Sequence, residues 1–448
     1  MQTNKPEFWE AVGFWFRLGW ISFGGPAGQI ALMHKHLVEE KKWISEDRFT
    51  HALGYCMLLP GPEAGQLATY LGWMLYGTLG GIVAGFLFVL PSFFIFLGIS
   101  SLYFYYGNVP FAVSFLNGVK PAVLSIVFVS FLNWIPKGIK TKGHWICFAA
   151  TILGMSVLRI PYPYLLAFSM IFGIFSFFLS KQATKKKKSP SEEERFSIGI
   201  GEFSENVRRR EENYKILKYM GGIGSAALIL WAVPLLAILL FLRTEFSFWK
   251  DLILFFTKTA LLTFGGAYAI LPSVAEYATG PAGWISLGEM IDGLAFGEST
   301  PGPLVMVLTF IGFLAGAHRY DSILSGVLGL TLTAYYTFLP SFILILGGAP
   351  IVEKTTESVP LRFVLDYVTA CVCAVILHLG IYFAKSVLLE PGASSDSCLG
   401  APFSCVRWMP LFITVTGVLL LRWKKDISIY WIAAGGFLFL GIDLSYYL

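Results

Sequence analysis

Ser22-Phe23-Gly24-Gly25-Pro26 begins a pattern that returns in the second half of the chain as Thr263-Phe264-Gly265-Gly266. Two further matches keep the same spacing, pairing Trp43-Ile44-Ser45 with Trp284-Ile285-Ser286 and Pro60-Gly61-Pro62 with Pro301-Gly302-Pro303. After a short insertion between His318 and Asp321, Leu90-Pro91-Ser92-Phe93 corresponds to Leu339-Pro340-Ser341-Phe342. Chance recurrence of Gly and Pro explains one such pair but not a series in register, so the sequence predicts an internal repeat.

The composition places this repeat in a membrane. The chain has 448 residues, of which 56% are hydrophobic and only 14% are charged. Uncharged stretches such as 79–106 and 220–242 are long enough to cross a bilayer as helices, and they lack the alternating polarity of barrel strands. We therefore predict an all-α polytopic membrane protein with two homologous halves in an inverted-topology repeat and with broken or re-entrant helices.

Four segments follow from the repeat and the charge distribution. Residues 1–180 form the N-terminal transporter repeat, and residues 248–448 form the inverted C-terminal repeat. Residues 181–218 are a charged cytoplasmic linker, and residues 219–242 are a connecting transmembrane helix. The linker is rich in lysine and arginine but also carries interspersed acids, which favours a solvated loop over a nucleic-acid-binding segment.

Loop charges predict that the two halves have opposite orientations. The loop with Lys137, Lys140 and Lys142 is basic, whereas its counterpart 390–404 has no Lys or Arg. Under the positive-inside rule, the N-terminus and the linker are cytoplasmic, and the C-terminus and the 390–404 loop are periplasmic. Pairing of Cys398 with Cys405 stays open, because it depends on whether that loop faces an oxidising compartment.

The paired glycine breaks are the predicted binding site. Inverted repeats bring corresponding broken helices together near the bilayer midplane, and glycines at a break expose backbone N–H groups that suit an oxyanion. Arg17 and Lys258 each stand two helical turns before a break; the alternative is that both side chains reach toward the membrane interface. The predicted substrate-binding residues are Arg17, Ser22, Gly24, Gly25, Lys120, Lys258, Thr263, Gly265 and Gly266.

The proline-glycine-proline tips and nearby carboxyls are the predicted gating or proton-coupling groups. A carboxylate inside a membrane is costly unless it is paired or protonated, so Glu63 is expected to bind a proton and to pair at another stage with Arg17 or Lys120. Helix capping or a structural ion pair are the alternatives. The full set is Pro60, Gly61, Pro62, Glu63, Glu298, Pro301, Gly302, Pro303 and Asp366.

Several functions have no support in the sequence. The chain has no Gly-rich phosphate loop, no nucleophile-plus-base spacing and no metal-ligand pattern among its six cysteines. We therefore predict a membrane transporter rather than an enzyme, with no cofactor, no metal and no nucleic-acid partner. The expected partners are an oxyanion, protons and membrane lipids, and a homodimer is left open.

The motifs together resemble the chromate ion transporter (CHR) family in its long two-domain bacterial form. The resemblance rests on residues 23–26, 60–63 and 118–122 and on the second-half motifs at 264–266 and 301–303. It implies an inner-membrane protein that exports chromate with the proton-motive force and confers chromate resistance. Ala267 and Leu304 replace the proline and the glutamate of the first half, so the halves are not expected to bind equally. The alternatives are another oxyanion such as sulfate, an uncoupled anion channel, or a membrane-embedded scaffold or enzyme for lipid head groups.

Overall fold

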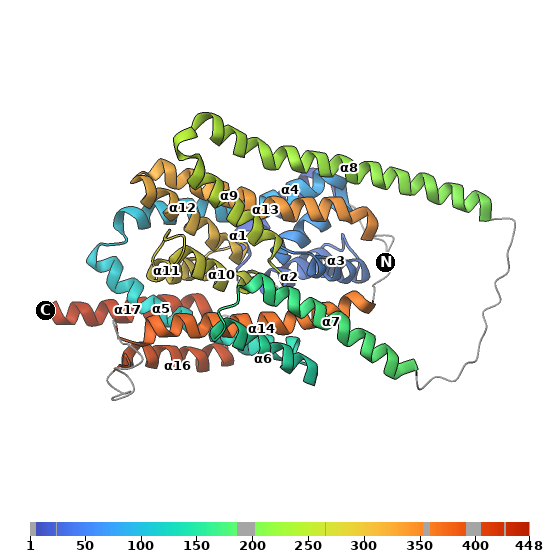
Figure 1. Ribbon diagram of the computed structural model, residues 1–448. Helices are drawn as coiled ribbons and strands as arrows, with labels where there is room; N and C mark the ends of the chain where they lie inside the picture. Colours follow the sequence, from blue (N-terminus) through green and yellow to red (C-terminus); the bar gives the residue numbers. More distant parts are fainter. Residues whose placement is uncertain are drawn as a thin grey trace.

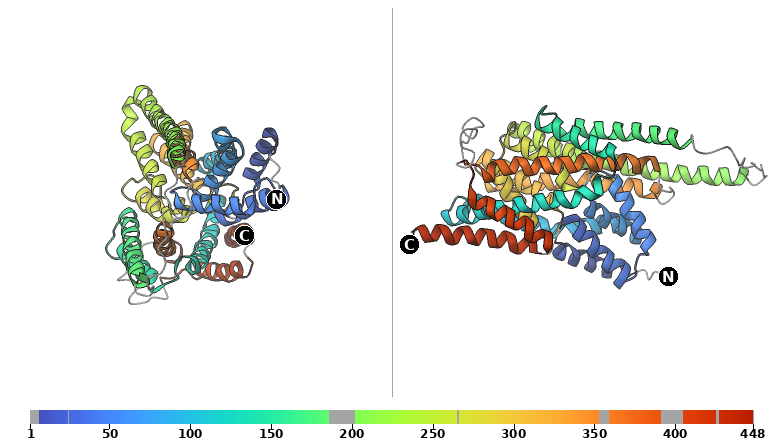
Figure 2. Two further views of the ribbon diagram at one scale, coloured as in Figure 1. Left: turned by 90° about the vertical axis from the view of Figure 1, so that its right-hand side faces the viewer. Right: turned by 90° about the horizontal axis from the view of Figure 1, so that it is seen from below.

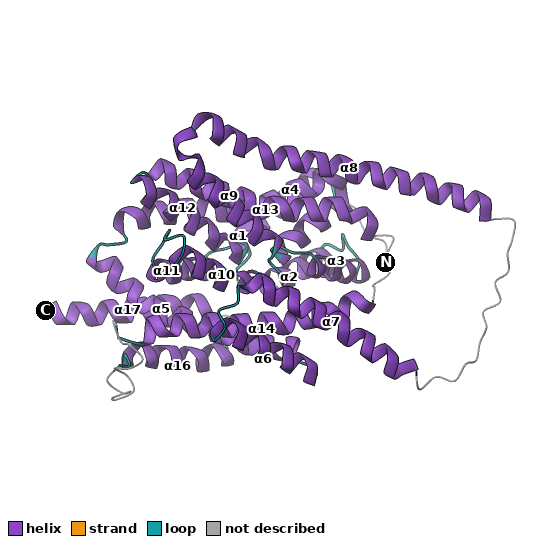
Figure 3. Ribbon diagram, in the orientation of Figure 1, coloured by secondary structure: helices purple, strands orange, loops and turns teal. Residues whose placement is uncertain are grey.

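The computed structural model describes residues 6–23, 25–185, 202–264, 266–352, 359–390, 405–424 and 427–447, and these residues are predominantly helical (Figure 3). The first half contains α1 (Phe8–Ile21), α2 (Gly25–His34) with the π-helical η1 (Lys35–Glu40), α3 (Glu46–Leu58), α4 (Glu63–Tyr106), α5 (Pro110–Gly138), α6 (Lys142–Ser156) and α7 (Tyr162–Lys185). These helices follow one another through short connections, as the apolar runs and their Gly/Pro boundaries predict.

The second half repeats this order of elements. It contains α9 (Phe246–Leu261), α10 (Ala267–Thr279), α11 (Leu287–Ser299), η3 (Leu304–Met306), α12 (Val307–Tyr320), α13 (Ile323–Val352), α14 (Val359–Leu388), α16 (Trp408–Trp423) and α17 (Ser428–Tyr447). Between the halves lie α8 (Glu202–Phe241) and η2 (Arg243–Glu245). By sequence position α8 has no counterpart in either half. It begins at Glu202, so it includes residues 202–218 of the segment predicted as a linker as well as the predicted connecting helix.

The predicted breaks end helices at the expected residues. The first glycine break separates α1 from α2, and the second separates α9 from α10. The tip at 60–62 separates α3 from α4, and the tip at 301–303 separates α11 from η3. A kink at Tyr76 and Gly77, where Gly77 has φ +65°, divides α4 into a short first piece and a long span. In the second half the corresponding pieces are two separate helices, α12 and α13.

Corresponding helices of the two halves run antiparallel where they meet. The long span of α4 lies along α13, with Gly81 against Leu346 and Gly85 against Phe342. In the same way, the end of α5 meets the start of α14 through an ion pair between Lys140 and Asp366. Opposite directions of matching helices are the arrangement that an inverted repeat requires.

The peripheral helices are exchanged between the halves. Helices α6 and α7 pack on α14 of the second half, while α16 and α17 pack on α5 of the first half (Figure 2). Close contact is made by glycines, because an added Cβ on Gly118 of α5 would lie 2.1 Å from the carbonyl oxygen of Gly435 of α17. One hydrophobic core therefore contains residues of both repeats.

The bundle is elongated, and the chain ends lie at opposite ends of it (Figure 1). The N-terminus, the end of α7 and the start of α8 lie at one end of the bundle, and the C-terminus lies at the other (Figure 1). Within the described residues, five helices are long and apolar enough to cross a membrane, at Glu63–Tyr106, Pro110–Pro136, Lys218–Phe241, Ile323–Pro350 and Phe363–Leu388. The chain is thus a multi-pass membrane protein.

The pairing of Cys398 with Cys405, which the sequence left open, is only partly described. Cys405 is disulfide-bonded, whereas Cys398 and the 391–404 loop lie outside the described residues. Cys56, Cys147, Cys371 and Cys373 are buried free thiols, as the sequence predicts for small residues in apolar helices.

Candidate functional site

The first glycine break meets the tip of the opposite half. The backbone N–H of Gly302 donates a hydrogen bond to the carbonyl oxygen of Ser22 at 2.9 Å. The side-chain amide of Gln29 donates to the carbonyl oxygens of Gly302 and Ser22, at 2.6 and 3.2 Å. We call this contact between α1–α2 and the second-half tip the first crossing.

The second crossing has the same backbone hydrogen bond with the halves interchanged, but its glutamine bonds within its own half. The backbone N–H of Gly61 donates to the carbonyl oxygen of Thr263 at 2.7 Å. The side-chain amide of Gln66 donates to the carbonyl oxygen of Pro60 at 2.7 Å. Each tip is therefore held by the break of the other repeat, and the structure brings together the four motifs that the sequence singled out.

Only glycine fits at the centre of each tip. Gly61 has φ +135° and Gly302 has φ +101°, a backbone region in which a residue with a Cβ is strained. An added Cβ on Gly61 would lie 2.0 Å from Oγ of Ser341, and one on Gly302 would lie 2.6 Å from Cβ of Ser92. The tips thus approach the two serines of the repeated Leu-Pro-Ser-Phe motif.

These serines are functional candidates that the sequence reasoning missed. Ser92 and Ser341 are 1% and 4% exposed, and neither hydroxyl has a hydrogen-bond partner among the described residues. The side-chain carbonyl oxygens of Gln29 and Gln66 are also buried without a hydrogen-bond partner among the described residues. Buried polar atoms are rarely left unpaired, so a cluster of them at both crossings indicates a place for a polar ligand. The recurrence of the serine motif in both halves was the available signal.

Helix N-termini add positive electrostatic potential at the second crossing. Helices α4 and α10 begin directly after a tip and a break, at Glu63 and Ala267. Their N-cap residues, Pro62 and Gly266, provide no side-chain cap for the first-turn N–H groups. Uncapped N–H groups and the helix dipole together favour an anion at such a position.

The predicted break residues are only partly available to a ligand. Gly25 and Gly266 have φ +70° and +86°, as a glycine break requires, whereas Gly24 and Gly265 lie outside the described residues. Ser22 Oγ donates to the carbonyl oxygen of Leu18 at 2.5 Å, and Thr263 Oγ1 to that of Thr259 at 2.6 Å. Their protons are used within their own helices, so the structure differs from the expectation that they donate to substrate.

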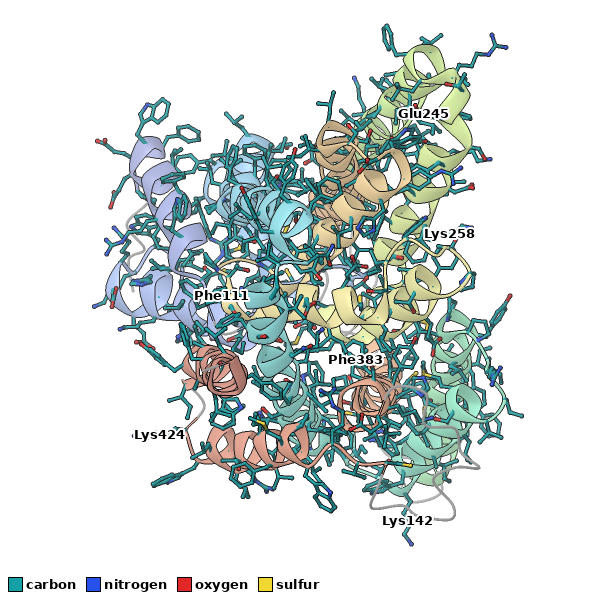
Figure 4. All side chains as sticks on the ribbon, turned by 90° about the vertical axis from the view of Figure 1, so that its left-hand side faces the viewer. Phe111, Lys142, Glu245, Lys258, Phe383 and Lys424 are labelled. Atoms are coloured by element: carbon teal, nitrogen blue, oxygen red, sulfur yellow. The ribbon has the colours of Figure 1, made fainter. Side chains whose placement is uncertain are left out.

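Arg17 and Lys258 differ in burial from the residues at the ends of their own helices. Both side chains are exposed, while Ser22 and Thr263 at the ends of the same helices are buried. Lys258 lies toward the rim of the bundle, apart from the central Phe383 (Figure 4). Two turns of helix bring a residue near the break along the axis but do not fix the face on which it lies. The expected pairing of Glu63 with Arg17 stays a prediction.

Lys120 has a partner that the sequence did not suggest. Its ammonium lies 3.7 Å from Oδ2 of Asp292, whose side chain is 3% exposed. Tyr103 donates a hydrogen bond to the same carboxylate oxygen at 2.9 Å. Helices α4, α5 and α11 thus supply one residue each, and Glu63 is not the carboxylate that pairs with Lys120. Asp292 is separated from the predicted motifs in sequence, so no pattern marked it.

The three predicted coupling carboxyls lie in different surroundings. Glu63 is buried, and its Oε1 is the atom that an added Cβ on Gly266 would meet, at 4.0 Å. Glu298 accepts a hydrogen bond from Tyr268, the second residue of α10. Asp366 forms its ion pair with Lys140 at 2.9 Å, away from both crossings. No group of three or more metal-ligating side chains occurs in the part of the chain that the structure describes.

Two repeats, each with a helix break that bonds to the tip of the other, define a polytopic α-helical membrane protein with broken helices at its centre. The chain belongs to the chromate transporter family, whose model matches residues 9–174 and 250–440. The two matched stretches fall on the two repeats and leave out all of α8.

Relatives of two lengths match the chain. It is 29% identical to a chromate transport protein of Pseudomonas aeruginosa over 80% of this chain and 77% of that protein. It is 26% identical to a chromate transport protein of Cupriavidus metallidurans over 93% of this chain and 88% of that protein. A shorter uncharacterised transporter of Bacillus subtilis is 29% identical over 38% of this chain and 88% of its own length. No solved structure gives a significant match.

Proposed function

We propose that this protein is a secondary active transporter that carries chromate, a tetrahedral divalent oxyanion, across the bacterial inner membrane and confers chromate resistance by proton-coupled efflux. The observation that carries the proposal is the pair of crossings, each with a buried hydroxyl that has no partner among the described residues, together with the two uncapped helix N-termini at the second crossing. The family membership and the names of the full-length relatives point to the same substrate.

The crossings have the chemistry that an oxyanion needs. Ser92 and Ser341 can each donate a hydrogen bond to an anion oxygen, and N–H groups at the starts of α4 and α10 can donate others. The contact between Gly85 and Phe342 sets the register of α4 and α13. In that register, six residues, or roughly 9 Å of helix, separate the two serines along the helix axis. We propose that the anion binds between the crossings, with the tips as gates.

Glu63 is the proposed coupling group at this site. Its carboxylate is at the first residue of α4 and near Gly266, so it occupies the region of positive potential that the anion would use. Two anions in one buried region repel each other, and protonation of Glu63 removes that repulsion. Glu298 and its partner Tyr268 are proposed as a second gating contact at the start of α10.

Flux into proteoliposomes tests the proposal. Purified protein is reconstituted, and uptake of radiolabelled chromate is measured with and without an imposed pH difference, with sulfate as competitor. We expect chromate uptake that a pH difference raises and that Glu63→Gln makes independent of pH while exchange continues. Flux that no proton gradient changes would indicate an anion channel, and stronger competition by sulfate would indicate another oxyanion substrate. The absence of flux under every gradient would contradict transport and leave a lipid-binding scaffold or enzyme.

A further inference from the structure

Lys120, Asp292 and Tyr103 form a charged cluster that the crossings do not include. Asp292 lies in the second turn of α11, and about 10 Å of helix separates it from Ser299, where α11 ends before the second tip. Gly288, one turn before Asp292, also faces the ammonium of Lys120, with 3.5 Å between Nζ and an added Cβ. The cluster therefore lies between the second tip and the N-terminal end of α11.

The ion pair in this cluster is loose. Charge-assisted N–H···O contacts are usually near 2.7–2.9 Å, whereas Lys120 Nζ and Asp292 Oδ2 are 3.7 Å apart. The other carboxylate oxygen, Oδ1, is buried and has no hydrogen-bond partner within the described residues. Lys120 is more accessible than Asp292, with 23% of its side chain exposed against 3%. The ammonium is thus both weakly held and reachable.

The cation of this cluster has no basic counterpart in the other repeat. The position that corresponds to Lys120 in the second half is Thr369, whose hydroxyl donates to the carbonyl oxygen of Leu365 in its own helix at 2.8 Å. A purely structural contact between α5 and α11 would not need a cation, because glycines and apolar side chains join the other exchanged helices. The asymmetry suits a group that acts at one end of a transport path.

We propose that Lys120 is a relay position for the oxyanion, at which its ammonium exchanges Asp292 for the anion as the anion moves between the crossings and the α11 end of the path. This inference rests on the proposed function. The ligand class is a divalent oxyanion, and Asp292 is the internal anion that holds Lys120 when no substrate is there. Tyr103 keeps its hydrogen bond to Asp292 and so positions the carboxylate during the exchange.

The charges around Asp292 determine how it tolerates the loss of its cation. Lys120 faces it from α5 and Tyr103 from α4, while Glu289 lies one turn away on α11 with His318 of α12 beyond it, 3.4 Å from Glu289 Oε1. Lys120 is the cation at ion-pair distance from Asp292 in the described structure. A buried carboxylate without a cation is costly, so Asp292 takes up a proton when the anion holds Lys120.

The relay predicts that neutral substitutions of Asp292 and of Lys120 change the Kd for chromate in opposite directions. Equilibrium dialysis of radiolabelled chromate against the detergent-solubilised full-length protein gives Kd for the parent, Asp292→Asn and Lys120→Gln. The Kd that these variants change is that of the weaker site, beside Lys120. At this site Asp292→Asn removes the competing anion and is expected to lower Kd about tenfold, whereas Lys120→Gln is expected to raise it by a similar factor. Asp292→Glu keeps the charge and should bind as the parent does. The matched control on the same helix is Glu289→Gln, which removes a carboxylate that pairs with His318 and should leave Kd unchanged. Asp292→Ser replaces Asp292→Asn if the latter is not monodisperse.

A structural ion pair predicts a different pattern. In that case both neutral variants weaken binding together with thermal stability, or neither changes Kd, and either result overturns the relay. A parent protein that binds neither chromate nor sulfate contradicts the proposed function itself. Binding by the parent with effects of the same sign at both positions contradicts the relay alone.

Discussion

At the scale of residues, the proposed anion site is formed by two buried serines rather than by the two cations that the sequence favours. Ser92→Ala and Ser341→Ala each remove a hydroxyl that has no partner among the described residues. Hydrogen bonds to charged groups contribute about 1.5–3 kcal/mol, so each change should raise the Kd for chromate about tenfold or more. Folding should be little affected, because neither hydroxyl makes a hydrogen bond to a described residue that the substitution would remove. Dialysis with radiolabelled chromate measures the affinity.

Ser100→Ala is the matched control for these variants. Ser100 is on the same helix as Ser92, is fully buried and also has an unpartnered hydroxyl, but it follows the crossing by two turns. Its removal should leave Kd unchanged. An unchanged Kd in both Ser92→Ala and Ser341→Ala would exclude the crossings as the anion site.

At the scale of elements, the tips require a backbone that only glycine adopts. Gly302→Ala would add a Cβ at φ +101° and 2.6 Å from Ser92. Strain of this kind costs about 1–3 kcal/mol, so we expect a lower unfolding temperature in detergent and loss of chromate uptake. Gly98→Ala, in α4 and with open space around its Cβ position, should unfold at the parental temperature or slightly above it. Equal unfolding temperatures of the two variants would contradict the assigned geometry of the tip.

Element boundaries were predictable because Gly and Pro act locally. The breaks after Ile21 and Leu261 and the tips at 60–62 and 301–303 follow from backbone geometry alone. Side-chain surroundings were not predictable in the same way, since the face on which Arg17 lies depends on how α1 packs against α4. Asp292 was missed for the same reason, because its partners come from two other helices.

At the scale of the whole molecule, the antiparallel halves predict the membrane orientation. The N-terminus and the start of α8 lie at one end of the bundle and the C-terminus at the other (Figure 1). In a cysteine-free background, an impermeant thiol reagent added to intact cells should label Ser395→Cys and leave Lys187→Cys unlabelled. The same reagent should label Lys187→Cys after the cells are permeabilised, which shows that the position is reactive. Labelling of Lys187→Cys in intact cells would contradict the proposed orientation.

Because each tip bonds to the break of the other half, we propose that one oxyanion binds between two breaks and two tips. Chromium scatters anomalously, so crystals of the protein soaked in chromate and measured at the chromium absorption edge locate the anion directly. We expect an anomalous peak between the crossings, within hydrogen-bond reach of Ser92 or Ser341, and a weaker peak beside Lys120. Anomalous peaks only at the exposed Arg17 or Lys258, with none between the crossings, would contradict it.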